Sequence, residues 1–240
     1  MGREVAKLCD AGYRGASLAV GVDVSADGTD AKCVSALSEV KNAAEIDCVV
    51  DFSHHSCAPA LLEFCKENGL AAVIATTGHT PEEKEAIFAA AEKIPVFYSG
   101  NMSLGIALLI ELAKNAAKTM PEAEIEIVEA HHNRKIDAPS GTALMISDAI
   151  TSVRPETYAH MGRTGQGKRD PKEIGIHSLR MGNVVGIHEV ILATQNQTIT
   201  LKHEAHNRAL FAEGALAAAE FLIGKGAGLY TMDDIVSENR

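Results

Sequence analysis

The stretch EAHHNRKIDAPSGTA, residues Glu129 to Ala143, decides how the fold of this chain is interpreted. The residues before it, 124–129, alternate between polar and apolar side chains. This period of two predicts a strand with Ile125 and Ile127 on its buried face, a face that extends to Glu129. The polar stretch is therefore expected to begin at the end of a half-buried strand.

The end of the stretch has the signals of a helix start. Residues 144–150 predict a helix with Ser140 as its N-cap and Pro139 just outside it. Two histidines, an Arg-Lys pair and an aspartate lie between strand and helix, where they can donate protons and hold anions beside the free N–H groups of the helix. Taken singly, these residues favour a polar loop with a capped helix, whereas their combination favours a functional site.

The overall composition is that of a globular protein large enough for one or two domains. The chain has 240 residues, of which 46% are hydrophobic and 22% charged. Its formal charge of −10 argues against a nucleic-acid partner and against an anionic membrane surface. No apolar run approaches the length of a membrane span, and residues 1–7 contain no leader-like apolar segment.

The cysteines and histidines favour a cytoplasmic protein without a structural metal. The five cysteines are odd in number, include no C-x-x-C pair and fit reduced thiols. Seven of the ten histidines lie between His131 and His206, so a metal hydrolase is an alternative class. Adjacent histidines on a strand do not readily bind one ion, and no H-E-x-x-H motif is present. Four histidines at strand spacing are expected on sheet surfaces or interfaces, namely His177, His188, His203 and His206.

The first hundred residues alternate between apolar strand-like runs and helical patterns. Strands are expected at residues 18–23, 46–52, 71–78 and 96–98, and helices at 1–12, 36–45, 58–68 and 81–93. The first helix should end at Gly12, the third at Gly69, and the fourth begins with Pro81. This alternation predicts a parallel, doubly wound sheet.

The pattern changes after residue 103. A long apolar helix, 104–119, precedes the strand that ends at the motif, and three strand-like runs follow a polar loop at 162–171. These runs are 174–181, 184–194 and 197–204, with turns at Gly182-Asn183 and Gln195-Asn196. Short turns predict an antiparallel meander, hence a second, mixed and largely antiparallel sheet. An alanine-rich helix, 209–222, follows. We therefore expect one domain from residues 1–102 and 209–240, and another from 103–208.

The motif also carries a family resemblance. The pattern E-A-H-H-x-x-K-x-D-A-P-S-G-T-A resembles the signature of dihydrodipicolinate reductase, and every fixed position is filled in this chain. The resemblance extends from Met1 to about Val236. It implies a cytoplasmic oxidoreductase of lysine and diaminopimelate biosynthesis. Such an enzyme reduces a cyclic unsaturated dicarboxylate imine, 4-hydroxy-tetrahydrodipicolinate or dihydrodipicolinate, with NAD(P)H. It also implies a homotetramer assembled through the sheets of the second domain.

The resemblance assigns roles to the motif residues. His131 looks like the family's acid–base residue, and Lys135 like its companion cation. The residues expected to bind the substrate are His132, Ser140, Gly141 and Thr142. Asp137 is expected to fix the loop or Lys135, and Arg134 to be a rim charge. No metal is expected in this site.

The cofactor would be expected at the carboxyl ends of the first sheet's strands. Asp23 ends a predicted strand, where a Rossmann acid holds the ribose, and its charge would repel a 2′-phosphate, so NADH is favoured. The remaining cofactor-binding residues expected from the resemblance are Met1, Phe52, Ala75, Thr76, Thr77, Ser99, Gly100, Asn101 and Met102. The family commonly has glycine where this chain has Ala75.

The chain begins within the family's glycine-rich turn, G-x-x-G-R-M-G, which Met1-Gly2-Arg3 resembles in part. The resemblance therefore implies a Rossmann-type sheet that lacks its first strand, which would lie between strands 18–23 and 46–51. Those two strands are expected either to pair directly or to stay apart. The alternative to an active reductase is a truncated, non-catalytic homologue that binds the substrate but not the cofactor.

Overall fold

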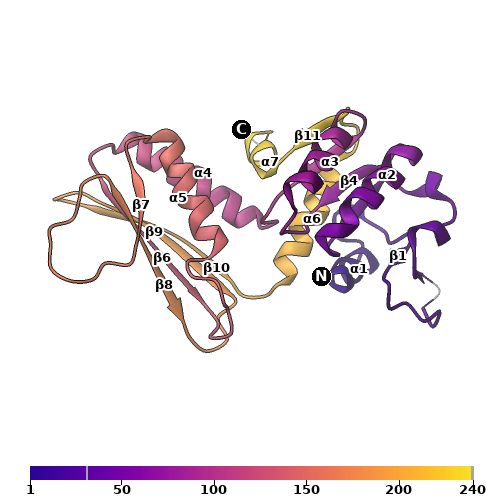
Figure 1. Ribbon diagram of the computed structural model, residues 1–240, viewed down its shortest axis with the longest axis horizontal. Coiled ribbons are helices and arrows are strands. Elements are labelled where there is room, and N and C mark those ends of the chain that lie inside the picture. Colours follow the sequence, from indigo (N-terminus) through magenta and orange to yellow (C-terminus); the bar gives the residue numbers. More distant parts are fainter. Residues whose placement is uncertain (31, 239–240) are drawn as a thin grey trace. The chain divides into compact units, whose positions relative to one another are not determined.

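The computed structural model describes residues 1–30 and 32–238. The chain forms two compact units, one of Met1–Ser103 with Ala209–Arg240 and one of Leu104–Arg208. Figure 1 traces both units along the sequence. Among the described residues, no helix is both long enough and apolar enough to cross a membrane.

The first unit is built on a four-stranded parallel sheet. Its strands are β3 (Cys48–Asp51), β4 (Ala71–Ile74), β5 (Pro95–Tyr98) and β11 (Gly228–Tyr230). Their order across the sheet is β11-β5-β4-β3, and every neighbouring pair is parallel. The helices of this unit are α1 (Gly2–Asp10), α2 (Ala58–Asn68), α3 (Pro81–Ala91), α6 (Ala209–Leu222) and α7 (Met232–Glu238). The predicted parallel sheet is confirmed.

Local signals account for the bounds of two of these helices. Helix α3 begins with Pro81, and Thr80 and Glu83 form a reciprocal capping box at its N-terminus. Helix α2 ends where Gly69 takes a left-handed conformation, with φ of 66°. The side chains of β4 are all buried, because helices of this unit cover both faces of a doubly wound sheet.

Two expected elements of the first unit were wrong. The predicted strand at 18–23 is reduced to β1 (Gly21–Val22), which pairs in parallel only with β2 (Cys33–Val34). Strands 18–23 and 46–51 were expected either to pair directly or to stay apart. Among the described residues β1 does not pair with β3, so the second alternative holds. The predicted helix at 36–45 is two short 3₁₀ turns, because Asn42 adopts a left-handed backbone that interrupts it.

The second unit has a five-stranded mixed sheet. Its strands are β6 (Glu124–His131), β7 (Tyr158–Met161), β8 (Glu173–Arg180), β9 (Gly186–Ala193) and β10 (Thr198–Ala205), in the order β10-β9-β6-β8-β7. Strand β6 is antiparallel to β9 and parallel to β8, and β7 is parallel to β8. The mixed sheet is confirmed, but the meander was wrong because β6 lies between β8 and β9. Strand β7 was not predicted.

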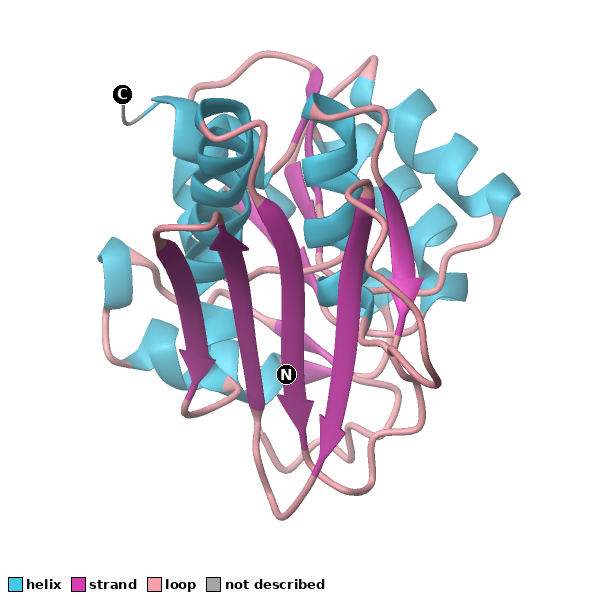
Figure 2. Ribbon diagram, turned by 90° about the vertical axis from the view of Figure 1, so that its left-hand side faces the viewer, coloured by secondary structure: helices cyan, strands magenta, loops and turns pink. Residues whose placement is uncertain are grey.

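Two helices cover one face of this sheet. Helix α4 (Leu104–Thr119) packs against β9 and β10, and α5 (Gly141–Val153) packs against β6 and β7. Figure 2 shows the opposite face of the strands turned toward the viewer. The helices and the sheet enclose an apolar core whose fully buried members include Ile125, Ile127, Ile146, Ile150, Ile174 and Leu192. The segment that joins β6 to α5, which contains most of the motif, begins at the end of β6.

Candidate active site

Strand β6 and helix α5 position the motif. Along β6, Ile125, Ile127, Glu129 and His131 are all buried, so the predicted alternation holds and places an acid and an imidazole on the core face. A turn closed by the Lys135 N–H donating to the His132 carbonyl, 3.1 Å, then reverses the chain.

Glu129 is the centre of the polar contacts in this site. Its side chain is completely buried, at 0% exposure. The Arg180 guanidinium donates to both carboxylate oxygens, at 2.7 Å to Oε1 and 2.8 Å to Oε2. His131 Nδ1 lies 2.6 Å from Oε2, and the Ser140 backbone N–H donates to Oε1 at 3.1 Å. One carboxylate thus connects the end of β6, the end of β8 and the start of α5.

These contacts keep the Glu129 carboxylate ionised. Burial alone would raise the pKa of Glu129, but hydrogen bonds from Arg180, Ser178, His131 and the Ser140 N–H outweigh it and lower the pKa to about 2. Arg180 also donates to the Asp137 carbonyl at 2.7 Å, which ties the motif loop to the same ion pair. A buried carboxylate needs this degree of compensation, because an unpaired one is strongly destabilising.

His188 lies in this candidate site, whereas it was expected on a sheet surface or at an interface. It lies opposite Glu129 on β9 and is only 4% exposed. Its ring packs edge-on against His131, with 5.2 Å between centroids, and Nε2 lies 3.1 Å from Ser140 Oγ. Burial, with the neighbouring charge of His131, lowers the pKa of His188 to about 4, so the ring is neutral near pH 7.

Lys135 brings a positive charge to the same site. Its ammonium lies 2.9 Å from Asp137 Oδ1, in agreement with the expected role of that aspartate. Hydrogen bonding to Lys135 lowers the pKa of Asp137. The charge of Lys135 also contributes to lowering the pKa of His131 and of His188. Arg134 is exposed and donates to Asn183 Oδ1 at 2.6 Å, which is consistent with a rim position.

The start of α5 adds backbone donors to the site. Ser140 is the N-cap, and its Oγ accepts from the Ala143 N–H at 3.2 Å. With His188 as a second partner, this buried hydroxyl is already engaged within the protein. The first helical turn begins at Gly141, and the backbone N–H groups of this turn point toward the N-terminal end of the helix. An anion at this end of α5 would meet those donors and the helix dipole.

Glu129, Arg180 and His188 are members of this candidate site that sequence reasoning did not assign to it. The sequence did contain a signal for Glu129, because the strand alternation places this charged residue on the same buried face as Ile125 and Ile127. Arg180 and His188 gave no local signal. The pairing of β6 with β8 brings Arg180 to Glu129, and the pairing of β6 with β9 brings His188 to His131 and Ser140.

A second candidate site lies at the carboxyl ends of β3, β4 and β5. Asp51 ends β3, is 2% exposed and accepts from the Ser53 hydroxyl at 2.5 Å and the Thr76 hydroxyl at 2.9 Å. The loop after β5 is held by Ser99 Oγ, which donates to the Asn101 carbonyl at 2.8 Å. Parallel strands present their carboxyl ends at one edge, so the structure brings the expected loops at 52–53, 75–77 and 99–102 to the same edge of the sheet.

Three features of the first unit suit a dinucleotide. Helix α1 begins at Gly2, with Met1 as its N-cap and no side-chain cap bond, which leaves backbone donors for an anion. Asp23 is exposed after β1, and both of its hydrogen bonds, from the Ser25 N–H and hydroxyl, fall on Oδ1. His79 follows the β4 loop, and neither of its buried ring nitrogens has a hydrogen-bond partner among the described residues.

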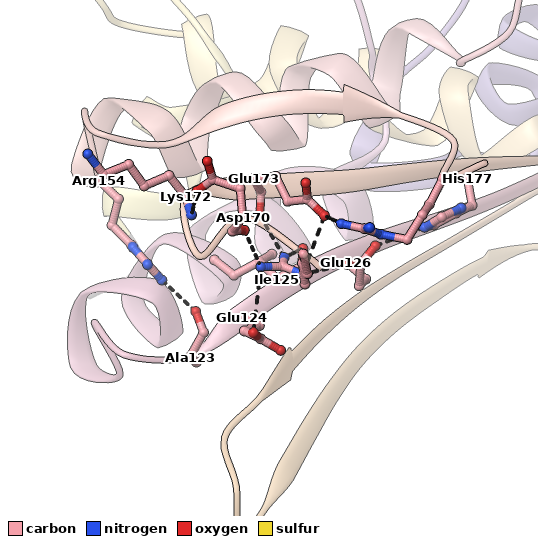
Figure 3. Close-up of polar contacts among 11 residues, drawn as sticks. Ala123, Glu124, Ile125, Glu126, Arg154, Asp170, Lys172, Glu173 and His177 are labelled. Atoms are coloured by element: carbon pink, nitrogen blue, oxygen red, sulfur yellow. Dashed lines mark hydrogen bonds and ion pairs between the residues drawn. The ribbon is translucent and has the colours of Figure 1, made fainter. Parts of the chain in front are cut away.

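A separate polar network lies near the start of β6. Figure 3 shows Glu126 beside His177, and Oε2 of the glutamate lies 2.8 Å from Nε2 of the histidine. Arg169 donates to Glu126 Oε1 at 3.0 Å and to the Glu173 carbonyl at 2.6 Å. The described residues contain no group of three or more His, Cys, Asp or Glu placed to hold a metal ion.

Known families and structures agree with this architecture. The family model described as dihydrodipicolinate reductase, N-terminus, matches residues 1–102, and that described as dihydrodipicolinate reductase, C-terminus, matches residues 105–236. A 4-hydroxy-tetrahydrodipicolinate reductase from Caldanaerobacter subterraneus subsp. tengcongensis is 48% identical over 240 residues, which cover 99% of this chain and 94% of that protein. One from Clostridium novyi is 46% identical over 192 residues, covering 79% of this chain and 76% of that protein.

The fold is shared with a solved structure titled dipicolinate-bound dihydrodipicolinate reductase, from Paenisporosarcina sp. TG-14. The TM-score is 0.80 at 24% identity, and the match covers 98% of this chain and 94% of that one. The two family models together span nearly all of the sequence, and one relative is nearly half identical over 94% of its own length. The resemblance found in the motif is therefore confirmed, and the chain belongs to the dihydrodipicolinate reductase family.

Proposed function

We propose that this protein is a reductase that converts 4-hydroxy-tetrahydrodipicolinate to tetrahydrodipicolinate with NAD(P)H, in the biosynthesis of diaminopimelate and lysine. The reaction consumes one hydride and one proton and releases water from the 4-hydroxy form. We place the enzyme in the cytoplasm. We further propose that it works as a homotetramer. The observation that carries the proposal is the buried His131, held by Glu129 beside Lys135 and the N-terminus of α5.

The motif residues fit a dicarboxylate substrate. The Lys135 ammonium and the first-turn N–H groups of Gly141 and Thr142 are fixed donors for carboxylate oxygens. His132 Nδ1 is buried without a hydrogen-bond partner among the described residues, which is consistent with a contact supplied by the substrate. Ser140 would act mainly by holding the start of α5, because its hydroxyl is engaged by Ala143 and His188.

The proton step falls to His131. Bound NAD(P)H would supply the hydride. Hydride addition increases the electron density on the nitrogen side of the substrate ring, and a proton must then be delivered to the substrate. An imidazole held at Nδ1 by Glu129 can deliver that proton from Nε2. Lys135 would stabilise negative charge that develops on the substrate. Glu129 stays ionised throughout, because the hydrogen bonds it accepts from Arg180, Ser178, His131 and the Ser140 N–H outweigh burial.

The cofactor would be held in the first unit. The α1 N-terminus at Met1 and Gly2 would face the pyrophosphate, and Asp23 the ribose hydroxyls. The remaining contacts would come from the loops after β3, β4 and β5, at Phe52, Ala75, Thr76, Thr77, Ser99, Gly100, Asn101 and Met102. Thr76 would contribute backbone rather than hydroxyl, because its Oγ1 is hydrogen-bonded to Asp51.

The test is an assay of the purified protein with freshly generated substrate and each cofactor in turn. We expect substrate-dependent oxidation of NADH or NADPH and formation of tetrahydrodipicolinate, measured by mass spectrometry. The proposal would be contradicted if the folded protein oxidised neither NADH nor NADPH in the presence of the substrate.

A further inference from the structure

Glu129 does not need His131 as a hydrogen-bond donor in order to be stable as a buried carboxylate. Arg180 already satisfies the buried carboxylate in a two-point contact, at 2.7 and 2.8 Å. Glu129 Oε2 nevertheless accepts a second donor, His131 Nδ1, at 2.6 Å, from a residue two positions along the same strand. Because residues two apart on a strand point to the same face, this geometry is built into β6.

We propose that Glu129 is a positioning residue that fixes His131 in the tautomer with its proton on Nδ1, so that Nε2 is the atom that gives the proton to the substrate. An ionised carboxylate can only accept, so the nitrogen facing it must carry a hydrogen. Arg180 acts through Glu129, because its guanidinium keeps the carboxylate charged. The kinetic consequences rest on the proposed reductase function, whereas the tautomer does not.

The surroundings of Nε2 agree with this assignment. Gly186 begins β9, and a Cβ at that position would lie 3.2 Å from His131 Nε2. That distance is tighter than ordinary van der Waals contact, so the glycine keeps space at the proton-donating edge of the ring. Among the described residues no hydrogen bond is made by Nε2, and the His131 side chain retains 11% exposure.

The charges around His131 explain why the carboxylate is needed. The groups that face the imidazole are Glu129 on β6, Arg180 on β8, His188 on β9 and Lys135 in the motif loop. Burial lowers the pKa of His131, and the charges of Lys135 and Arg180 lower it further. Only the hydrogen bond and the charge of Glu129 raise it. Without Glu129 the ring would be neutral over more of the working pH range and unable to donate.

The same strand supplies a matched control. Glu126 also pairs with an arginine and a histidine (Figure 3), Arg169 at 3.0 Å and His177 at 2.8 Å. It lies three residues before Glu129 and so on the other face of β6, and its side chain is partly exposed. Glu126→Gln therefore removes one carboxylate charge from β6 without touching His131. It is expected to keep the wild-type pH profile and tautomer.

The first measurement uses ¹⁵N NMR of the histidine rings in the free protein. In the wild type the neutral His131 ring should carry its proton on Nδ1 throughout its titration. In Glu129→Gln the amide can donate to Nδ1, so the proton should move to Nε2. A wild-type His131 that is protonated at Nε2 in its neutral form would overturn the proposal, and this result needs no variant to fold.

The second measurement is the pH dependence of kcat. The proton donor must be protonated, so kcat should fall as the pH rises through the pKa of His131. Glu129→Gln should move this alkaline limb at least about one pH unit lower and reduce kcat near pH 7 roughly ten- to a hundredfold, with little change in KM. Glu129→Asp, which keeps the charge, should restore part of the rate. A Glu129→Gln enzyme with the wild-type limb would contradict the proposal. A wild type without reductase activity would reject the proposed function but leave the NMR result standing.

Discussion

Gly214 of α6 lies directly against the backbone of Met102, and a Cβ at Gly214 would be 1.6 Å from the Met102 carbonyl oxygen. Both residues belong to the first unit, in which α6 packs on the parallel sheet. The close approach fixes the end of the loop at 99–102, one of the loops proposed to hold the cofactor. A glycine inside a helix costs stability, so its presence here is explained by the approach of the carbonyl.

Gly214→Ala should therefore destabilise the protein by about 2 kcal/mol, despite the better helix propensity of alanine. The clash is with backbone, which cannot rotate away, so α6 or the loop has to shift. The free energy of unfolding in urea measures this. A Gly214→Ala protein at least as stable as the wild type would show that the contact does not constrain the loop.

Gly175→Ala is the matched comparison. Its Cβ would lie 1.7 Å from Glu126 Oε2, but this atom is the end of a flexible, half-exposed side chain. Glu126 can swing outward at the loss of its pairs with Arg169 and His177. The cost should be roughly 1 kcal/mol or less, as for other partly exposed ion pairs.

Acid should weaken the fold in a pH window set chiefly by His188. Its pKa is lowered from 6.5 to about 4, first by burial and then by the charge of His131. Below about pH 6.5 His188 binds a proton in the unfolded chain but stays neutral in the folded protein. Its contribution to stability is therefore fully present above this pH and is lost as the pH falls to 4. The loss from this residue amounts to about 3 kcal/mol. His79, His131 and His203 also have lowered pKa values and act in the same direction.

Urea unfolding at pH 7 and pH 5 tests this with two variants. His188→Gln should flatten the dependence on pH. His206→Gln, at an exposed position, should change it much less, because the charge of His206 is only the smaller cause of the lowered pKa of His203. An unchanged dependence in His188→Gln would assign the acid sensitivity to other groups.

The cofactor preference should follow Asp23. Hydrogen bonds from Ser25 lower the pKa of Asp23, with a smaller contribution from the charge of Arg3, so the carboxylate is ionised and would repel a 2′-phosphate. We expect NADH to bind more tightly than NADPH, by roughly tenfold. Asp23→Asn should reduce that ratio, and Arg3→Ala should weaken NADPH more than NADH. Isothermal titration calorimetry measures each affinity, and tighter NADPH binding to the wild type would refute the role of Asp23.

Thr142 should affect binding rather than turnover. It lies in the first turn of α5, where a hydroxyl can donate to a substrate carboxylate in the ground state and transition state alike. Thr142→Val keeps the shape of the side chain and should raise KM roughly three- to tenfold with kcat nearly unchanged. Steady-state kinetics that show a fall in kcat at constant KM would contradict this role.

The sequence predicted the elements whose ends carry local signals. Helices 58–68, 104–119 and 209–222 have the predicted bounds, and Ser140 caps α5 as expected. The errors fall where pairing over long distances decides the outcome. The short link at Gly182-Asn183 favoured a hairpin, but β6 is inserted between the strands it joins. Only that insertion brings Arg180 to Glu129 and His188 to His131 and Ser140, so most of the polar network around His131 could not be predicted.

The central claim is that His131 delivers the proton while Lys135 balances charge, and the turnover of His131→Gln and Lys135→Ala tests it most directly. Neither residue has to contribute much to ground-state binding. The measurement is kcat with the cyclic imine substrate and saturating cofactor, after circular dichroism has shown that both variants are folded. We expect kcat to fall by roughly two to four decades in each variant, the range for a lost general acid, with KM much less affected. A folded His131→Gln enzyme with near wild-type turnover would contradict the account.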